Sequence, residues 1–124
     1  VIATDIRKAE GCQILDVMDK NEVKKLVSEE QITEIYHLAA LLSATGEKNP
    51  KLCWDINVTG LENVIAAAKE NKARIFSPSS IAVFGPTTPK ENTPQKTVME
   101  PSTVYGISKV SGEFWCSYYH EKYE

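Results

Sequence analysis

Short apolar runs alternate with longer amphipathic stretches along this chain. The short runs are rich in aliphatic residues and are bounded by polar ones, which is typical of β-strands. They predict strands at residues 1–6, 12–15 and 34–38, and a fourth that begins at 74–76 and runs on to Pro78. The first run is almost wholly apolar, so we expect that strand to be buried.

Three stretches have the 3.6-residue period of a helix. In residues 19–30 the aliphatic side chains fall on one face. A longer helix is expected to start with Asn49 as N-cap and Pro50 at its first position, and to continue to about residue 71. After a proline-rich loop over residues 85–101, a last helix is expected over about 103–122. A loop of that length without regular structure is usually functional.

The order of these elements predicts the fold class. Short apolar strands separated by helices favour a parallel sheet covered on both faces, which is the doubly wound α/β class. A length of 124 residues fits one domain spanning residues 1–124.

Composition excludes several function classes. The net charge of −3 gives no basic surface for nucleic acid or an anionic membrane, and no apolar run is long enough to span a bilayer. The three cysteines are widely spaced and form no CxxC, so neither a metal site nor a disulfide framework is expected. Reduced thiols indicate an intracellular, cytoplasmic protein.

The strongest chemical signal is Tyr105 followed by Lys109. Residues four apart lie on one face of a helix, where an ammonium stabilises a phenolate and lets it exchange a proton with a substrate hydroxyl. Ser79 and Ser80 come just after the fourth predicted strand, where ligands of parallel sheets bind. Their hydroxyls could bond a substrate oxygen.

Two further polar residues point to a cofactor. Asp5 ends the first predicted strand, where an acid in dinucleotide-binding folds bonds the adenosine ribose and favours NAD over NADP. Asn57 falls on the apolar face of its helix, so its amide should be buried and needs partners. It could organise the site by bonding backbone or water near the cofactor.

Together these residues resemble the extended, epimerase-like branch of the short-chain dehydrogenase/reductase superfamily. The resemblance implies an NAD-dependent enzyme in which Tyr105 is the catalytic base, Lys109 holds the nicotinamide ribose and Ser80 polarises the substrate. It also implies cofactor contacts from segments that follow the strands and from the long helix, namely Asp5, Ile6, Asp16, Val17, Leu38, Ala39, Ala40 and Asn57. His37, which precedes Leu38, is expected to be structural.

A narrower resemblance is to the epimerase-type L-threonine 3-dehydrogenases. It is carried by HLAALLSATGEKNP, PSSIAVFGPTTPKENTPQ and PSTVYGISKVSGE. It implies oxidation of the threonine 3-hydroxyl by NAD, with substrate contacts from Ser43, in the loop after the third strand, and from Ser79 and Ser80. It also implies a homodimer formed through the long helix and the last helix. Two alternatives stay open: a nucleotide-sugar epimerase or dehydratase of the same family, and a non-catalytic interaction protein.

One part of the family pattern is absent. None of the six glycines forms the GxxGxxG turn that holds a pyrophosphate. In the family's strand order 3-2-1-4-5, residues 1–6 and 34–38 match strands 2 and 4, and nothing matches strand 1. We therefore expect a fragment of a longer enzyme that binds NAD poorly alone. The edges of these two strands should either face a gap of about 9–10 Å or close up and pair.

Overall fold

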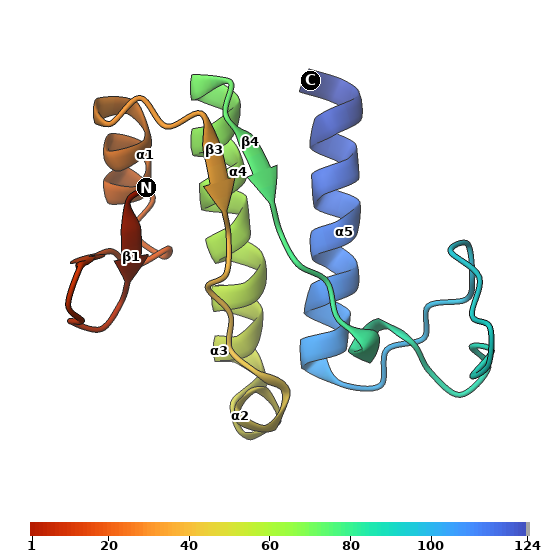
Figure 1. The fold of residues 1–124 in the computed structure, drawn as a ribbon. Coiled ribbons are helices and arrows are strands. Elements are labelled where there is room, and N and C mark those ends of the chain that lie inside the picture. Colours follow the sequence, from red (N-terminus) through yellow and green to blue (C-terminus); the bar gives the residue numbers. More distant parts are fainter. Residues whose placement is uncertain (124) are drawn as a thin grey trace.

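Short parallel strands and longer helices alternate in the computed structural model, which describes residues 1–123 (Figure 1). The strands are β1 (Ala3–Asp5), β2 (Cys12–Ile14), β3 (Glu34–Tyr36) and β4 (Arg74–Phe76). The helices are α1 (Lys20–Glu29), α2 (Ser43–Lys48), α3 (Pro50–Trp54), α4 (Gly60–Asn71) and α5 (Val104–Tyr123). A π-helical turn, η1 (Asp55–Thr59), joins α3 to α4, and a 3₁₀ turn, η2 (Ile81–Val83), follows β4.

The helix ends follow from local capping. The Asp19 carboxylate accepts the backbone N–H groups of Asn21 and Glu22 at 3.0 Å, which starts α1. The Asn49 side chain accepts the N–H of Leu52 at 3.3 Å, as predicted for the start of the long helix. Lys72 ends α4 in the left-handed conformation, with φ of 54°.

The strands form two separate parallel pairs rather than one sheet. β1 pairs with β2, with Ala3 opposite Cys12, and β3 pairs with β4, with Ile35 opposite Ile75. Within residues 1–123 no pairing joins β1 to β3. Of the two arrangements considered from the sequence, the separated edges are therefore found, and the closed sheet is not. The pairing is parallel as expected, and the fold is Rossmann-like.

The core lies on one face of the β3–β4 pair. Val23 and Val27 of α1 pack with Val64 and Ala67 of α4, and Ile35 and Ile75 contact this cluster from the strands. In Figure 1, α4 lies behind β3 and β4, with α1 and α5 on either side. The opposite face is open, because the alternating residues Tyr36 and Phe76 remain 63% and 53% exposed.

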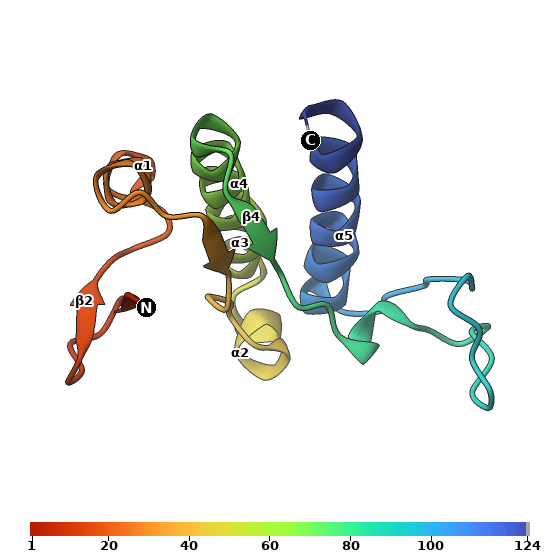
Figure 2. The ribbon, with the colours of Figure 1, turned by 45° about the horizontal axis from the view of Figure 1, so that its top comes forward.

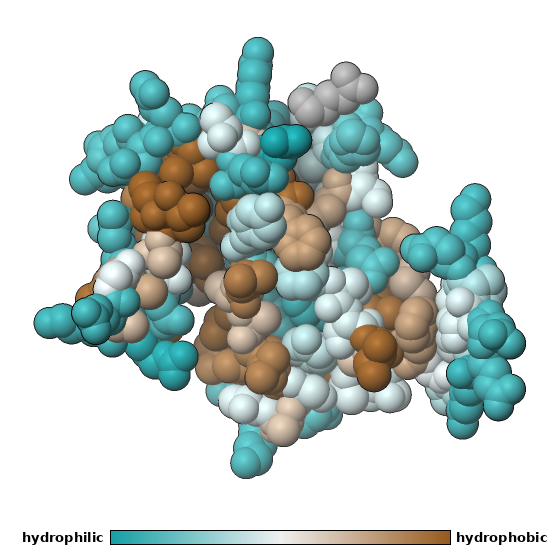
Figure 3. Space-filling view, in the orientation of Figure 1, coloured by the Kyte–Doolittle hydropathy of each residue, from teal (hydrophilic) through white to brown (hydrophobic). Residues whose placement is uncertain are grey.

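This open face corrects two expectations. Helices were expected over both faces of the sheet, but in the described part of the chain they cover only one; Figure 3 shows apolar side chains left on the other. The first strand was expected to be buried, yet Val1 is fully exposed and Ile6 is 62% exposed. The reason is local: β1 packs mainly against β2 and has no helix above it.

The element boundaries also differ from prediction in three places. Each strand ends one or two residues before the predicted end. Ser43 was expected in a loop but is the first residue of α2. The predicted long helix is interrupted by the π turn η1, although its apolar residues keep a regular helical spacing throughout.

The loop from Gly85 to Pro101 extends away from the helices (Figure 2). It has no regular element, as predicted. None of the helices in residues 1–123 is long and apolar enough to cross a membrane.

Candidate active site

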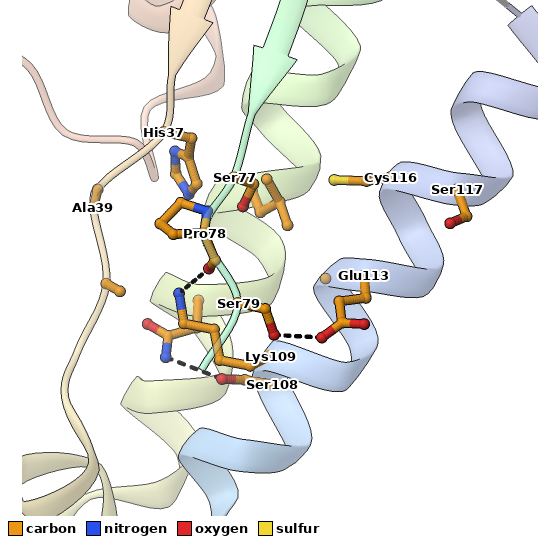
Figure 4. A pocket seen from close by; sticks show the side chains of 14 residues that line it. His37, Ala39, Ser77, Pro78, Ser79, Ser108, Lys109, Glu113, Cys116 and Ser117 are labelled. Carbon is orange, nitrogen blue, oxygen red and sulfur yellow. Dashed lines mark hydrogen bonds between the residues drawn. The ribbon is translucent and has the colours of Figure 1, made fainter. Parts of the chain in front are cut away.

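The candidate site is built where the chain leaves β3 and β4 and meets α5. Parallel strands point their carboxyl ends to the same edge, so the segments that follow them meet there. A cavity of about 280 Å³ opens at this place. Its walls come from the segment after β3, the segment after β4, η1 and the inner face of α5 (Figure 4).

Tyr105 and Lys109 are held by a firmly capped start of α5. The Thr103 hydroxyl accepts the N–H of Gly106 at 3.0 Å, and the Glu47 carboxylate of α2 accepts the N–H of Val104 at 2.9 Å. The two residues lie on one side of the helix as predicted: the Lys109 Nζ atom is 5.6 Å from the centre of the Tyr105 ring.

Lys109 reaches from α5 to the end of the β4 segment. Its ammonium donates to the carbonyl of Pro78 at 3.0 Å. Burial lowers the pKa of Lys109, because removal from water disfavours the charged form. The remaining two ammonium hydrogens are available for a ligand in the cavity.

His37 is buried beside this lysine. Only 8% of it is exposed, and burial, assisted by the positive charge of Lys109, lowers the pKa of His37 to about 4. The imidazole is therefore neutral at physiological pH. This agrees with the structural role expected for it.

The two serines after β4 make different contacts. The Ser80 oxygen accepts the N–H of Ala82 at 3.2 Å and so caps η2. Ser79 donates its proton to the carboxylate of Glu113, one turn beyond Lys109 on α5. Figure 4 shows this bond beside the one from Lys109 to Pro78.

Asn57, at the centre of η1, is buried as predicted, with 6% exposed, and its amide is fully partnered. Its oxygen accepts the N–H of Leu41 at 2.7 Å, and its nitrogen donates to the Leu41 carbonyl at 3.0 Å. The same nitrogen donates to the Ser108 hydroxyl at 3.0 Å, and Ser108 donates to the Tyr105 carbonyl at 2.7 Å. One side chain thus links the segment after β3 to the helical turn that carries Tyr105.

The predicted cofactor residues fall into two groups. Ala39, Ala40, Asn57 and Lys109 line the cavity, whereas Tyr105, which was also expected to contact the cofactor, does not line it. The second group, Asp5, Ile6, Asp16 and Val17, lies at or just after the ends of β1 and β2 and lines no part of the cavity. Leu38 is 70% exposed.

The acidic residues of the second group have the chemistry needed for a dinucleotide. One oxygen of Asp5 accepts the N–H of Arg7 at 2.8 Å, and this bond lowers the pKa of the carboxyl and keeps it ionised. In the described part of the chain its second oxygen has no hydrogen bond, so it can accept from a ribose hydroxyl. Asp16 closes a turn by accepting the N–H of Met18 at 2.9 Å, which leaves its other oxygen to a ligand. These residues fit NAD.

Sequence reasoning missed two residues of the site. Ser108 is 1% exposed and joins Asn57 to Tyr105; no pattern singles out a serine on a helix. Glu113 could have been found from its spacing, since it lies four residues after Lys109 and eight after Tyr105. Among residues 1–123 no group of three His, Cys, Asp or Glu side chains could hold a metal ion.

Comparison with known proteins gives a consistent result. Residues 2–124 match the model of the "NAD dependent epimerase/dehydratase family". An uncharacterised epimerase/dehydratase of Staphylococcus saprophyticus is 49% identical over 99% of this chain and 41% of its own length. The chain therefore spans about two fifths of the curated relatives it matches.

Two solved structures are similar over 98% of this chain and 41% of theirs, each with a TM-score of 0.94. One is described as a monomeric L-threonine 3-dehydrogenase from a metagenome, at 48% identity. The other is L-threonine dehydrogenase of Clostridium difficile, at 44% identity.

Proposed function

Because this chain belongs to the NAD-dependent epimerase/dehydratase family, we propose that it carries the catalytic residues of a longer NAD-dependent enzyme that oxidises the 3-hydroxyl of L-threonine to 2-amino-3-oxobutanoate. The observation that carries the proposal is the Tyr105–Lys109 pair on α5, whose lysine bonds the carbonyl of Pro78, the residue before the two serines.

Tyr105 is the general base. Its phenolate takes the proton of the 3-hydroxyl, and the Lys109 ammonium stabilises the phenolate from the same helix face. In residues 1–123 the Ser80 oxygen accepts the N–H of Ala82 and no acceptor is found for its hydroxyl, so this hydroxyl can donate to the reacting oxygen. NAD, when bound, would accept the hydride that leaves C3 of threonine while the 3-hydroxyl becomes a carbonyl.

Other residues hold the cofactor and substrate in place. Asp5 and Ile6 would contact the adenosine ribose, Asp16 and Val17 the adenine, and Leu38, Ala39 and Ala40 the dinucleotide where it passes the sheet edge. Asn57 supports that last segment through Leu41. Ser43, at the start of α2, and Ser79 were expected to contact threonine.

We favour threonine over other alcohols as the substrate because this chain resembles threonine dehydrogenases. The stretches after β3 and β4 and around Tyr105 are similar to threonine dehydrogenases, and two structures so described are 44–48% identical to this chain. The second candidate is a nucleotide-sugar 4-epimerase or dehydratase of the same family, because the curated relative is named an uncharacterised epimerase/dehydratase.

The test is NADH formation by the complete enzyme that contains these residues, with L-threonine compared against UDP-galactose. We expect turnover with threonine, and a loss of about 10²–10⁴-fold in kcat for Tyr105→Phe. Tyr119→Phe on the same helix is the matched control and should retain kcat. Turnover by Tyr105→Phe at the wild-type rate would remove Tyr105 from its role, and turnover of the sugar alone would establish the second candidate.

The 124-residue chain alone should bind NAD weakly, because its sequence has no glycine-rich turn to hold the pyrophosphate. Isothermal titration calorimetry of this chain should show no saturable binding at micromolar NAD. Saturation in that range would show that the phosphate contacts come from elsewhere in the chain.

We also propose that the enzyme is a cytoplasmic homodimer. Along α5 an apolar stripe of Ile107, Phe114 and Tyr118 is 44–60% exposed, and a second copy would cover it. The three cysteines are free thiols, which supports a reducing compartment. Ultracentrifugation of the complete enzyme with and without Phe114→Lys tests the dimer, and the monomeric state described for one similar enzyme is the opposing outcome.

A further inference from the structure

Two charged side chains of α5 form hydrogen bonds with consecutive residues of the segment that follows β4. The Lys109 ammonium donates to the Pro78 carbonyl at 3.0 Å, and the Glu113 carboxylate accepts a hydrogen bond from the Ser79 hydroxyl. Lys109 and Glu113 are one turn apart, so they point the same way from the helix (Figure 4). The segment is therefore fixed at two adjacent points.

The same segment is also pressed against the start of α5. A Cβ atom added to Gly106 would lie 2.2 Å from the carbonyl oxygen of Ala82, so only glycine allows the helix to come this close. Ser80 comes after Pro78 and Ser79, which bond α5, and before Ala82, which contacts Gly106, and it caps the turn that contains Ala82. Contacts on both sides of Ser80 in the sequence therefore fix its position.

The hydrogen bonds give the two neighbouring serines different capacities. A hydroxyl has one proton to donate. The Ser79 hydroxyl donates its hydrogen bond to Glu113, whereas the Ser80 oxygen accepts the N–H of Ala82 and no acceptor for its hydroxyl is found in residues 1–123. Of the pair, Ser80 is therefore the one whose hydroxyl can donate to a substrate oxygen.

We propose that Glu113 is a positioning residue that acts through Ser79, and that the Ser79–Glu113 bond holds Ser80 and the Pro78 carbonyl in register with Tyr105 and Lys109. Ser79 is then a support for the site and not a substrate contact, which replaces the role expected from its place after β4. This inference rests on the proposed function for its kinetic test, but its geometry is independent of which substrate reacts.

The kinetic test compares single and double variants of the complete enzyme. Ser79→Ala and Glu113→Ala should each lower kcat by roughly 10- to 100-fold while the KM for threonine changes by less than about threefold, because misplaced groups slow the chemical step. The double variant should be no worse than the worse single variant, since both remove one bond. Ser79→Thr and Glu113→Gln keep a donor and an acceptor, and should recover most of kcat.

A matched control is Glu62→Ala, a half-buried helical glutamate for which no hydrogen bond or ion pair is found in residues 1–123. It should leave both constants unchanged. A raised KM in Ser79→Ala with no effect of Glu113→Ala would make Ser79 a substrate contact and overturn the proposal. Additive losses in the double variant would overturn it as well.

A second measurement needs no substrate. Hydrogen exchange on the complete enzyme without substrate should show the amide of Ala82, which donates to Ser80, exchanging roughly tenfold faster or more in Glu113→Ala, with no change in α4. Unchanged exchange would overturn the proposal even if the enzyme oxidises threonine. If the enzyme acts only on a nucleotide sugar, the same variants are assayed with that substrate, so failure of the proposed function leaves this test intact.

Discussion

The buried amide of Asn57 connects two separate segments of the candidate site. Its oxygen and nitrogen bond both backbone groups of Leu41, which imitates the pairing of a neighbouring strand. Its second amide hydrogen reaches Ser108, whose hydroxyl continues to the Tyr105 carbonyl. The segment after β3 and the helix that carries Tyr105 therefore share a single support, and a change at Asn57 should disturb both.

Replacement of Asn57 by leucine should destabilise the protein by about 2–4 kcal/mol. The loss arises because both backbone groups of Leu41 and the Ser108 hydroxyl lose their partner in a poorly hydrated place. Urea unfolding measures it. Ser108→Ala removes one of these bonds and should cost only about 1 kcal/mol. Equal losses in the two variants would contradict the central role of the amide.

His37 should make stability depend on pH. Its pKa is about 4 in the folded chain, against 6.5 for an unperturbed histidine. Between these values the unfolded state binds the proton and the folded state does not, so stability is lost as pH falls from about 6.5 to 4. The loss attributable to His37 should be about 2–3 kcal/mol.

The measurement is urea unfolding at pH 7 and pH 4.5 for wild type and His37→Gln. The difference between the two proteins isolates this histidine from the carboxyl groups. His120→Gln, an exposed histidine on α5, is the control and should behave as wild type. The same pH dependence in His37→Gln and wild type would show that the imidazole is accessible to protons in the folded state.

At the scale of single residues, the sequence was most informative where spacing alone fixes geometry. The four-residue interval predicted the shared face of Tyr105 and Lys109, and the apolar neighbours of Asn57 predicted its burial. The partner of Ser79 could not be predicted, because the Glu113 carboxylate comes from 34 residues away and depends on the docking of α5.

Among the elements, α5 matters most because of how closely it approaches the β4 segment. Its first turn carries Gly106, where an added Cβ would meet the Ala82 carbonyl at 2.2 Å and Pro101 at 2.9 Å. Backbone and proline atoms cannot move aside as a flexible side chain can. The position of the helix, and with it Tyr105 and Lys109, therefore depends on this glycine.

Gly106→Ala should destabilise the protein by about 1–3 kcal/mol and lower kcat, although alanine favours helices by about 1 kcal/mol. Gly112→Ala is the matched control on the same helix, because its Cβ would meet only the end of the Leu61 side chain, at 3.1 Å. That variant should lie within about 1 kcal/mol of wild type. Thermal unfolding of both variants measures the contrast, and equal effects would refute the close approach at Gly106.

The elements were predictable where their signals are local. The cap predicted at Asn49 gave the start of the long helix, the apolar face of residues 19–30 gave α1, and short apolar runs gave all four strands. The π turn at Asp55–Thr59 was not predictable, since one extra residue in a turn leaves the apolar pattern almost unchanged. Helix α2 is six residues long and has no side-chain cap, so no local sequence signal predicts it.

At the scale of the whole molecule, side-chain bonds connect the elements around α5, while the strands form two separate pairs. α5, η1 and the β4 segment are joined by side-chain bonds that need nothing outside the chain. The strand pairs, in contrast, leave unpaired edges and an open face with Tyr36 and Phe76. Burial of strands depends on partners distant in sequence, which explains why the buried first strand was predicted wrongly.

Because β3 pairs only with β4 in residues 1–123, neighbouring amides at the end of β3 should exchange with solvent at very different rates. In a parallel pair, successive amides point to opposite sides of the strand. The His37 amide donates to the Phe76 carbonyl at 2.9 Å, so the preceding amide, of Tyr36, points to the unpaired edge that faces β1. Hydrogen exchange on the 124-residue chain should therefore find the Tyr36 amide exchanging at least about tenfold faster than that of His37. Comparable protection of both amides would mean that β1 and β3 close up in solution, and the open arrangement would then be rejected.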